Sequence, residues 1–483
     1  MTTTAAPSSA PPVEQRRPRT TGGFSALLLR LHFYAGILVA PFLLVAALTG
    51  LAYVFAPQVE RIIYADELVV ANPGDQTVPV AQQIAAARAT HPQGALLSLR
   101  PGEGEATTQI DFSSPELDEE HQHTVYVDPY TGTATGQLTT WFATTPFTTW
   151  LDDLHRNLHL GDTGRHYSEL AASWLWVITL GGLILWWQRQ RGKRTARRML
   201  TPDLSAKKGV RRTRGWHAAT GVWLTIGLLV LSATGLTWSR YAGENFGLAV
   251  DALKGSRPSV STTIGGPAEP ATGGHHGGAT TPAEGDGVDP AVVDSVLKVA
   301  RDNGISGPVA ITVPEDAATA WTVQQNRAQW PVARDNIAVD AATGTVVDQV
   351  KFADWPVMAK LTQWGIYAHM GSLFGLTNQI LLAALAIGLI CVIVWGYRMW
   401  WQRRPTRADR RALVGAPPAR GAWQGLPAWG IAVGVPVVFA VGWALPLFGI
   451  PLAAFLLFDA VIGAIRSRRK DEAVPVSPAP AGG

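Results

Sequence analysis

The sequence predicts a polytopic α-helical membrane protein with two large polar inserts. Hydrophobic residues make up 47% of the 483 residues and charged residues only 16%, which is typical of membrane proteins. Six apolar runs reach the ~20 residues that a membrane-spanning helix needs. These predicted spans are residues 25–56, 170–190, 215–241, 374–402, 426–443 and 445–465.

Basic residues predict the orientation of the spans. Arg and Lys are concentrated in the segments 191–214 and 403–425 and in the tail 466–483. If the chain has six spans, these three segments lie on the same side of the membrane as the tail 1–24. Because basic loops stay in the cytoplasm, we expect both termini to be cytoplasmic and the protein to lie in the cytoplasmic (inner) membrane. Residues 1–24 are rich in Pro, Ser and Thr and are expected to be a disordered tail. The small net charge of +4 gives no indication of nucleic-acid binding.

The segments between paired spans are expected to be extracytoplasmic α+β inserts. The first insert (57–150) has helical patterning at 80–90 and predicted strands at 95–99, 107–112 and 124–127. The second (288–352) follows a Gly/Pro/Thr-rich flexible linker (242–287), with a helix at 291–302 and strands at 309–313, 320–324 and 336–339. Each insert contains an Asp-x2-Thr-Gly turn, beginning at Asp128 and Asp340.

Two spans carry the same histidine motif. The pattern H-x3-G-x12-T-G-L begins at His32 and again 185 positions later at His217 (217 − 32). A histidine in a membrane is costly unless it is paired or liganded, so two at matched depth suggest a shared partner. The alternatives are a polar pair bonded across helices or histidines that reach the interface. We therefore interpret the chain as a tandem duplication of span, insert and span, followed by a two-span hairpin.

A second histidine pair is expected where the inserts return to the membrane, in segments 151–169 and 353–373. Repeat symmetry favours His159 with His369. His155 is an alternative to His159, because it lies four residues earlier and would share its helical face. The single cysteine, Cys391, excludes a c-type haem attachment and thiolate clusters, so a metal cofactor would need His or oxygen ligands.

These patterns resemble the PepSY-associated transmembrane family, which includes iron-regulated membrane proteins and siderophore reductases of the inner membrane. The resemblance covers about residues 25–402, and the inserts resemble PepSY modules. It is carried by His32-x3-Gly36 with Thr49-Gly50, Leu154-His155-Arg156 with Gly161 and Gly164-Arg165, His217-x3-Gly221 with Thr234-Gly235, and His369-x-Gly371 with Phe374-Gly375-Leu376 and Gln379. At least one branch of the family carries two non-covalent haems and reduces ferric siderophores.

The resemblance implies two non-covalent b haems. His32 and His217 would be the axial ligands of an inner haem, and His159 (or His155) with His369 those of an outer haem. Two axial histidines suit electron transfer, because no open iron site remains. Glycine would let the macrocycle approach the backbone, and arginine would bind propionates. These supporting residues would be Gly36, Gly221, Arg30 and Arg214 at the inner site, and Arg156 and Arg165 at the outer site.

The predicted function is transmembrane electron transfer from an unknown cytoplasmic donor to an extracytoplasmic acceptor. The predicted acceptor is a ferric siderophore, which would make the protein a haem-dependent ferric-chelate reductase. There is no separate catalytic acid or base in this hypothesis. Two alternatives remain. The protein could be a non-enzymatic regulator whose inserts bind an extracytoplasmic protease or sensor, or a non-redox accessory of metal or siderophore uptake.

Overall fold

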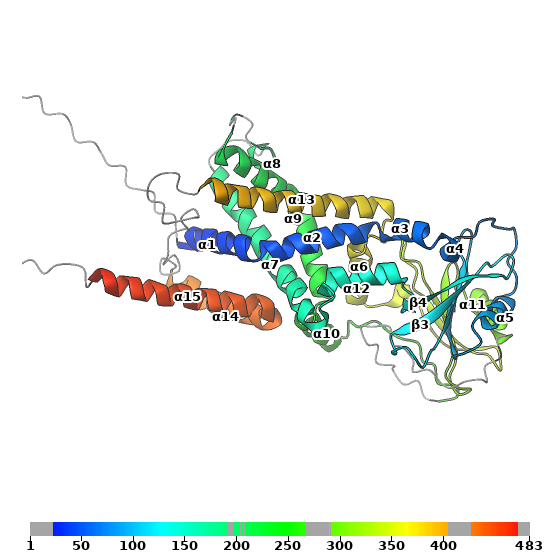
Figure 1. The fold of residues 1–483 in the computed structure, drawn as a ribbon. Coiled ribbons are helices and arrows are strands. Elements are labelled where there is room, and N and C mark those ends of the chain that lie inside the picture. The colour runs from blue at the N-terminus through cyan, green and yellow to red at the C-terminus, as the bar shows by residue number, and fades with distance from the viewer. Residues whose placement is uncertain are drawn as a thin grey trace, which may run out of the picture.

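The computed structural model describes residues 23–191, 197–202, 205, 208–266, 289, 291–403 and 427–471. Most of the predicted tail 1–24, nearly all of the loop 403–425, residues 267–287 of the predicted linker and the end of the tail 466–483 lie outside these residues. The described chain forms a helical bundle with a β-sheet domain at one end, as Figure 1 shows. Both its first helix, α1, and the end of its last helix, α15, lie at the end of the bundle away from the sheet.

Three described helices are long and apolar enough to span a membrane, and a bent pair adds a fourth. The three are α7 (Gly161–Gln190), α9 (Val210–Leu236) and α13 (Leu376–Gln402), and the pair is α1 (Gly23–Leu38) with α2 (Ala40–Val54). The last two predicted spans correspond to α14 (Ala428–Ala444) and α15 (Pro446–Asp471). Their apolar stretches are shorter than a full span, so six spans remains a prediction.

The first predicted span is bent rather than straight, with an angle of 56° between α1 and α2. Pro41 explains the bend, because a proline has no N–H to donate to the carbonyl four residues earlier. That carbonyl belongs to Ile37, and it accepts a hydrogen bond from the Tyr397 hydroxyl of α13 at 2.9 Å. The bend is therefore stabilised by a neighbouring helix.

The four spans form a bundle in which α1/α2 and α9 occupy opposite corners. Helix α7 packs against α1 and α9 on one side, and α13 packs against α2 and α9 on the other. Side chains on α1 and α9 can therefore meet in the middle of the bundle, flanked by α7 and α13.

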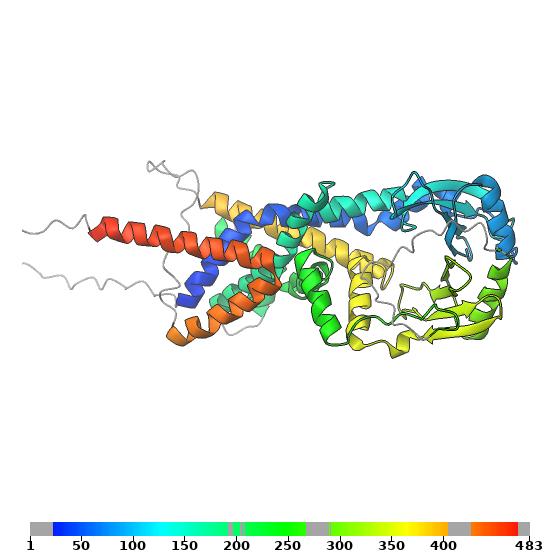
Figure 2. The same cartoon turned by 90° about the horizontal axis from the view of Figure 1, so that it is seen from below.

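The two inserts form one antiparallel sheet instead of two separate domains. Its strand order is β4-β3-β2-β1-β5-β6-β7-β8, and the halves join where Leu99 of β1 lies opposite Ile311 of β5. Figure 2 shows the two halves side by side, the first in blue and the second in green and yellow. The strands are β1 (Leu96–Arg100), β2 (Thr108–Phe112), β3 (His121–Val127), β4 (Ala134–Trp141), β5 (Val309–Thr312), β6 (Trp321–Gln325), β7 (Asn336–Asp340) and β8 (Thr345–Val350).

The structure confirms the predicted turns and adds the edge strands that follow them. Gly132 and Gly344 have φ of 69° and 67°, and their N–H groups donate to the carbonyls of Asp128 and Asp340. The strands after these turns, β4 and β8, were not predicted. They are half-exposed sheet edges with many polar residues, so they lack the apolar run of the inner strands.

One hydrophobic core joins both halves, with α5 (Val80–Thr90) and α11 (Val292–Asp302) packed on the sheet and on each other. Helix α5 follows Pro79 and has no side-chain cap of its own. Its first N–H groups, at Val80 and Ala81, donate to the carboxylate of Asp294 in α11, at 2.9 and 3.0 Å. A residue of the second insert thus caps a helix of the first.

Shorter helices connect the sheet to the bundle. Two of them, α6 and α12, run from the sheet toward the bundle and carry the histidines discussed below. The short elements are α3 (Ala56–Ile63), α4 (Ala65–Leu68), α6 (Pro146–Asn157), α8 (Arg197–Leu200), α10 (Tyr241–Ala252), η1 (Phe352–Asp354) and α12 (Val357–His369).

The C-terminal hairpin of α14 and α15 packs along the bundle. A buried ion pair joins Arg30 of α1 to Asp459 of α15 at 2.5 Å, with 2% and 6% of the side chains exposed. The Trp174 indole of α7 donates to the Leu447 carbonyl at 3.2 Å. Since lone charges are costly in a membrane, this ion pair ties the hairpin to the first span.

Candidate functional site

Two histidine pairs lie at different levels of the bundle. His32 of α1 and His217 of α9 form the loop-side pair, near the predicted basic loops, and their ring centroids are 6.3 Å apart with planes at 83°. His155 of α6 and His369 of α12 form the sheet-side pair, with centroids 6.4 Å apart and planes at 52°. In each pair the structure thus brings together two histidines that are far apart in the sequence.

The helices α6 and α12 position the sheet-side pair. Helix α6 begins with Pro146 after the N-cap Thr145, and its last turn is held by the Tyr167 hydroxyl, which donates to the His155 carbonyl at 2.6 Å. Helix α12 ends at His369, shortly before Gly371, whose φ of 83° suits a glycine that terminates a helix.

The Thr-Gly dipeptide of each repeated motif contacts a sheet-side histidine. The Thr49 hydroxyl lies 2.9 Å from Nδ1 of His155, and the Thr234 hydroxyl lies 2.8 Å from Nδ1 of His369. Both hydroxyls also contact the carbonyl four residues earlier in their own helix, at 2.9 and 2.8 Å. A threonine hydroxyl has one proton, and donating it to the carbonyl leaves the oxygen to accept from Nδ1–H.

The loop-side histidines are fixed through the same ring nitrogen. Nδ1 of His32 donates to the Ile178 carbonyl of α7 at 3.0 Å, and Nδ1 of His217 donates to the Val392 carbonyl of α13 at 2.9 Å. A carbonyl can only accept, so Nδ1 carries the proton in both rings. All four neutral imidazoles therefore keep the lone pair on Nε2, which is the tautomer suited to metal ligation.

Glycines make room for each imidazole. A Cβ added at Gly50 would lie 3.1 Å from Cε1 of His155, and one added at Gly182 would lie 2.9 Å from Cε1 of His32. Gly235 and Gly396 face Cε1 of His369 and His217 less closely, at 3.6 and 3.7 Å. A larger residue at Gly50 or Gly182 would displace the ring.

The spacing within both pairs suits two ligands of one metal ion. Because a metal–nitrogen bond is ~2.0–2.1 Å and the nitrogen lies about 1.2 Å from its ring centre, opposed imidazoles on one metal would have centroids about 6.4 Å apart. The observed separations are 6.3 and 6.4 Å. The donor set, two neutral imidazoles on facing helices, fits the bis-histidine coordination of a b haem.

His159 does not face His369, and this corrects our expectation from repeat symmetry. Helix α6 ends at Asn157, and Leu158 and His159 both adopt left-handed φ, of 56° and 55°. His159 therefore leaves the helical face that it was expected to share with His155. It is exposed, and its ring lies 5.2 Å from that of Trp150.

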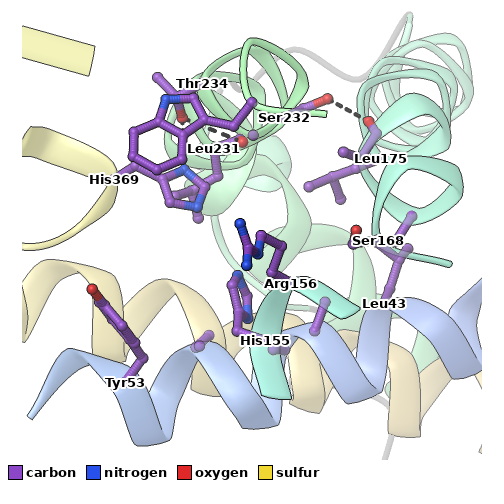
Figure 3. A pocket seen from close by; sticks show the side chains of 18 of the residues that line it. Leu43, Tyr53, His155, Arg156, Ser168, Leu175, Leu231, Ser232, Thr234 and His369 are labelled. Atoms are coloured by element: carbon purple, nitrogen blue, oxygen red, sulfur yellow. Dashed lines mark hydrogen bonds between the residues drawn. The ribbon is translucent and has the colours of Figure 1, made fainter. Parts of the chain in front are cut away.

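A cavity of about 230 Å³ lies beside the sheet-side pair. Figure 3 shows His155, Arg156 and His369 among the side chains that line it. The predicted propionate ligands Arg156 and Arg165 both line this cavity. Arg156 also forms ion pairs with Asp152 and Asp153, at 3.5 and 3.0 Å.

Two carboxylates that line this cavity, those of Asp152 and Glu169, interact with other groups of the protein. Burial raises the pKa of Asp152, and the charge of Arg156 opposes this shift. Glu169 is 1% exposed and accepts the N–H groups of Tyr241 and Ala242 at the start of α10, both at 3.0 Å. The lining is otherwise apolar where the cavity extends toward the middle of the bundle, at Leu43, Leu175, Leu228 and Leu389.

The two arginines predicted at the loop-side site, Arg30 and Arg214, lie in different surroundings. Arg30 lies two residues from His32, on another helical face, and its charge is balanced by Asp459. This corrects the expectation that Arg30 would bind a propionate. Arg214 lies one turn before His217, where the charges of Arg189, Arg211 and Arg403 also act on it.

The predicted glycines Gly36 and Gly221 lie one turn after His32 and His217. An added Cβ at either position would meet no atom within 4 Å in the described part of the chain. Space beside the rings is what a flat macrocycle would require, so these two positions remain compatible with the prediction.

Sequence reasoning missed the Nδ1 partners. Thr49 and Thr234 were recognised only as parts of the repeated motif, with no role at a histidine. The available signal was the sequence spacing, since each threonine follows its motif histidine by the same number of residues. A constant spacing indicates that both threonines have the same role. The carbonyls of Ile178 and Val392 have no sequence signature, since any residue supplies one.

A family model described as the PepSY-associated TM region matches residues 29–403. The chain belongs to the PepSY-associated transmembrane family. It is therefore a membrane protein, in agreement with its apolar helices. The family match contains both histidine pairs, their threonine partners and the whole sheet, whereas α14 and α15 lie beyond it. A search of curated proteins found no match.

Proposed function

We propose that this protein is a diheme b-type electron carrier that passes electrons across the membrane to an acceptor on the side of the sheet domain. The acceptor would be a ferric chelate such as a ferric siderophore, and the protein would act as its reductase. The basic loops would face the cytoplasm, where an unidentified one-electron donor would bind. The sheet domain would then be extracytoplasmic.

The observation that carries the proposal is the pair of matched histidine sites. In each, two imidazoles from facing helices lie 6.3 or 6.4 Å apart with Nδ1 committed to an acceptor. Haem bound there would supply one-electron Fe(III)/Fe(II) chemistry. Two histidines at each site would suit electron transfer, because with both of them bound the iron would have no open position for a substrate.

The residues of the chain would have separate roles in this function. The Nε2 atoms would be the axial ligands, and the Nδ1 partners would hold the rings in orientation and raise their basicity. Arg156 and Arg165 would bind propionates at the sheet-side site, and Arg214 would do so at the loop-side site.

The two sites would divide the path of an electron across the membrane into shorter steps. On α9, His217 and Thr234 are 17 residues apart, which corresponds to about 25 Å along a helix. This is most of the ~30 Å thickness of the hydrocarbon core. One site near each surface would leave only the middle of the bundle between them.

Haem stoichiometry in single variants tests the proposal. The purified protein should contain close to two haems per chain by pyridine haemochrome, with a split α/β band after dithionite reduction. His369→Ala and His155→Ala should each lose about one haem, and His217→Ala should lose the other. His159→Ala, four residues from His155, is the matched control and should keep both.

A haem-free protein purified from haem-replete cells would overturn the proposal. If the histidine variants were then stable and still bound an extracytoplasmic protein, the regulator hypothesis would gain support. If haem were present but dithionite-reduced protein left ferric chelates oxidised, the reductase part of the proposal would fail and the electron-carrier part would stand.

A further inference from the structure

An aromatic cluster lies between the second half of the sheet and helix α12. The Phe352 ring lies 4.9 Å from that of Trp355 and 6.3 Å from that of Trp364, and Trp330 lies 5.5 Å from Trp364. Trp364 belongs to the helix that ends at His369, about 8 Å earlier along its axis. The cluster therefore adjoins the sheet-side histidine pair, yet it has no part in holding the rings.

Buried hydrogen-bond donors without partners gather at this cluster. Among the described residues, Nε1 of Trp355, Nε1 of Trp364 and Nε of Arg334 are buried and make no hydrogen bond. Trp355 is only 4% exposed as a whole residue. Buried N–H groups in folded proteins are nearly always paired with protein, water or a ligand, so several together indicate that an acceptor belongs here.

Positive charge accompanies these donors. The Arg257 guanidinium lies 5.1 Å from the Trp355 ring centre, and the charge of Arg334 acts on it. Partial desolvation and the charge of Arg334 lower the pKa of Arg257 to about 10, so it stays charged at neutral pH. Within the described ranges, neither arginine forms a salt bridge with a carboxylate.

One carboxylate at the cluster, that of Asp335, accepts a hydrogen bond from the backbone. Asp335 accepts the N–H of Phe352 at 2.7 Å. Arg334 itself donates to the side-chain oxygens of Asn326 and Gln324, at 3.0 and 3.1 Å, which are neutral groups. The guanidinium group of Arg257, the Nε–H of Arg334 and the indole N–H groups therefore remain to bind an external anion.

We propose that Arg257, Arg334 and the indole N–H of Trp355 form a binding site for an anionic, oxygen-rich group, such as the carboxylates of a ferric chelate. The inference rests on the proposed function for the identity of the ligand, because it makes this site the place where the electron acceptor docks. Guanidinium groups bind carboxylates through charge-assisted hydrogen bonds. The aromatic rings beside them provide a flat apolar wall.

The test is calorimetric titration of the full-length protein with gallium(III) citrate, a redox-inert probe of the same charge and shape as the ferric complex. The wild type in nanodiscs of neutral lipid should bind the probe, and Arg257→Gln and Trp355→Phe should each weaken binding at least tenfold. Arg257→Lys, which keeps the charge, should lose less. Lys298→Gln on α11 removes an exposed positive charge elsewhere on the same half and should bind like the wild type.

Equal binding by all variants, or no binding by the wild type, would overturn the proposal. Binding that vanishes in nanodiscs containing phosphatidylglycerol would assign the site to an anionic lipid headgroup and would also overturn it. Haem content is measured on the same samples. Because gallium citrate needs no electron transfer to bind, this experiment and the haem stoichiometry can fail independently.

Discussion

Replacing Thr234 by valine should weaken haem binding at the sheet-side site only. Valine has almost the shape of threonine, so the change removes the hydroxyl that lies 2.8 Å from Nδ1 of His369 and little else. The buried Nδ1–H would lose its acceptor, which costs about 1–3 kcal/mol. Loss of such a partner of a metal-binding histidine typically lowers affinity 10–100-fold.

The expected effect is therefore a loss of about 1.4–2.8 kcal/mol in haem affinity. We would measure it as the rate and extent of haem transfer from the purified protein to an excess of apomyoglobin. One of the two haems should leave faster in Thr234→Val, and the other should be unchanged. Thr234→Ser keeps the hydroxyl and should behave like the wild type.

Thr225→Val is the matched control for this experiment. Thr225 lies on the same helix, is 8% exposed, and its hydroxyl donates to the Gly221 carbonyl at 2.8 Å. In the part of the chain that the structure describes, this hydroxyl contacts no histidine. If Thr225→Val and Thr234→Val released haem equally, the hydroxyl of Thr234 would be acting only on its own helix, and our reasoning about Nδ1 would be refuted.

Two further substitutions test other parts of the structure. Gly182→Val should abolish haem binding at the loop-side site and spare the sheet-side site, because the added Cβ would lie 2.9 Å from Cε1 of His32; retention of two haems per chain by pyridine haemochrome would contradict this. Asp459→Asn should destabilise the protein by about 3–5 kcal/mol, because it removes the carboxylate that balances buried Arg30. Thermal unfolding in detergent measures this loss, and an unchanged midpoint would show that the ion pair does not hold the hairpin to the bundle.

The helices and inner strands could be predicted because their patterns are local. The helix predicted at 80–90 has these bounds in the structure, and β2 and β7 begin within one residue of the predicted starts. Their apolar residues recur with the period of a helix or fill a buried strand. The edge strands β4 and β8 carry polar residues on a half-exposed surface, so the same signal is absent.

The joining of the two inserts could not be predicted, because it depends on contacts between distant residues. The pairs Ser98 with Thr312 and Leu99 with Ile311 bring β1 beside β5 across more than 200 positions. No local pattern states which edge of one insert will meet the other. The same limit applies to Asp294, whose capping of α5 becomes visible only once the helices are packed.

The choice between His155 and His159 shows how one backbone angle can decide a site. Spacing alone put the two histidines on the same face of a helix. The left-handed φ of Leu158 ends the helix between them. The sequence does not predict this helix end, because the residue that adopts the left-handed conformation there is usually glycine or asparagine and not leucine. The Leu154-His155-Arg156 motif contains the histidine that the structure places opposite His369, although repeat symmetry had led us to favour His159.

The repeated motif has a double role that explains its constant length. Its histidine belongs to the loop-side pair, and its threonine, 17 residues later, holds a histidine of the sheet-side pair. An inserted or deleted residue between them would rotate the threonine by about 100° away from its partner, because a helix has 3.6 residues per turn. The fixed spacing in both copies is expected if each of these spans must support both histidine sites at once. The span that carries the motif then sets the distance between the loop-side and sheet-side sites.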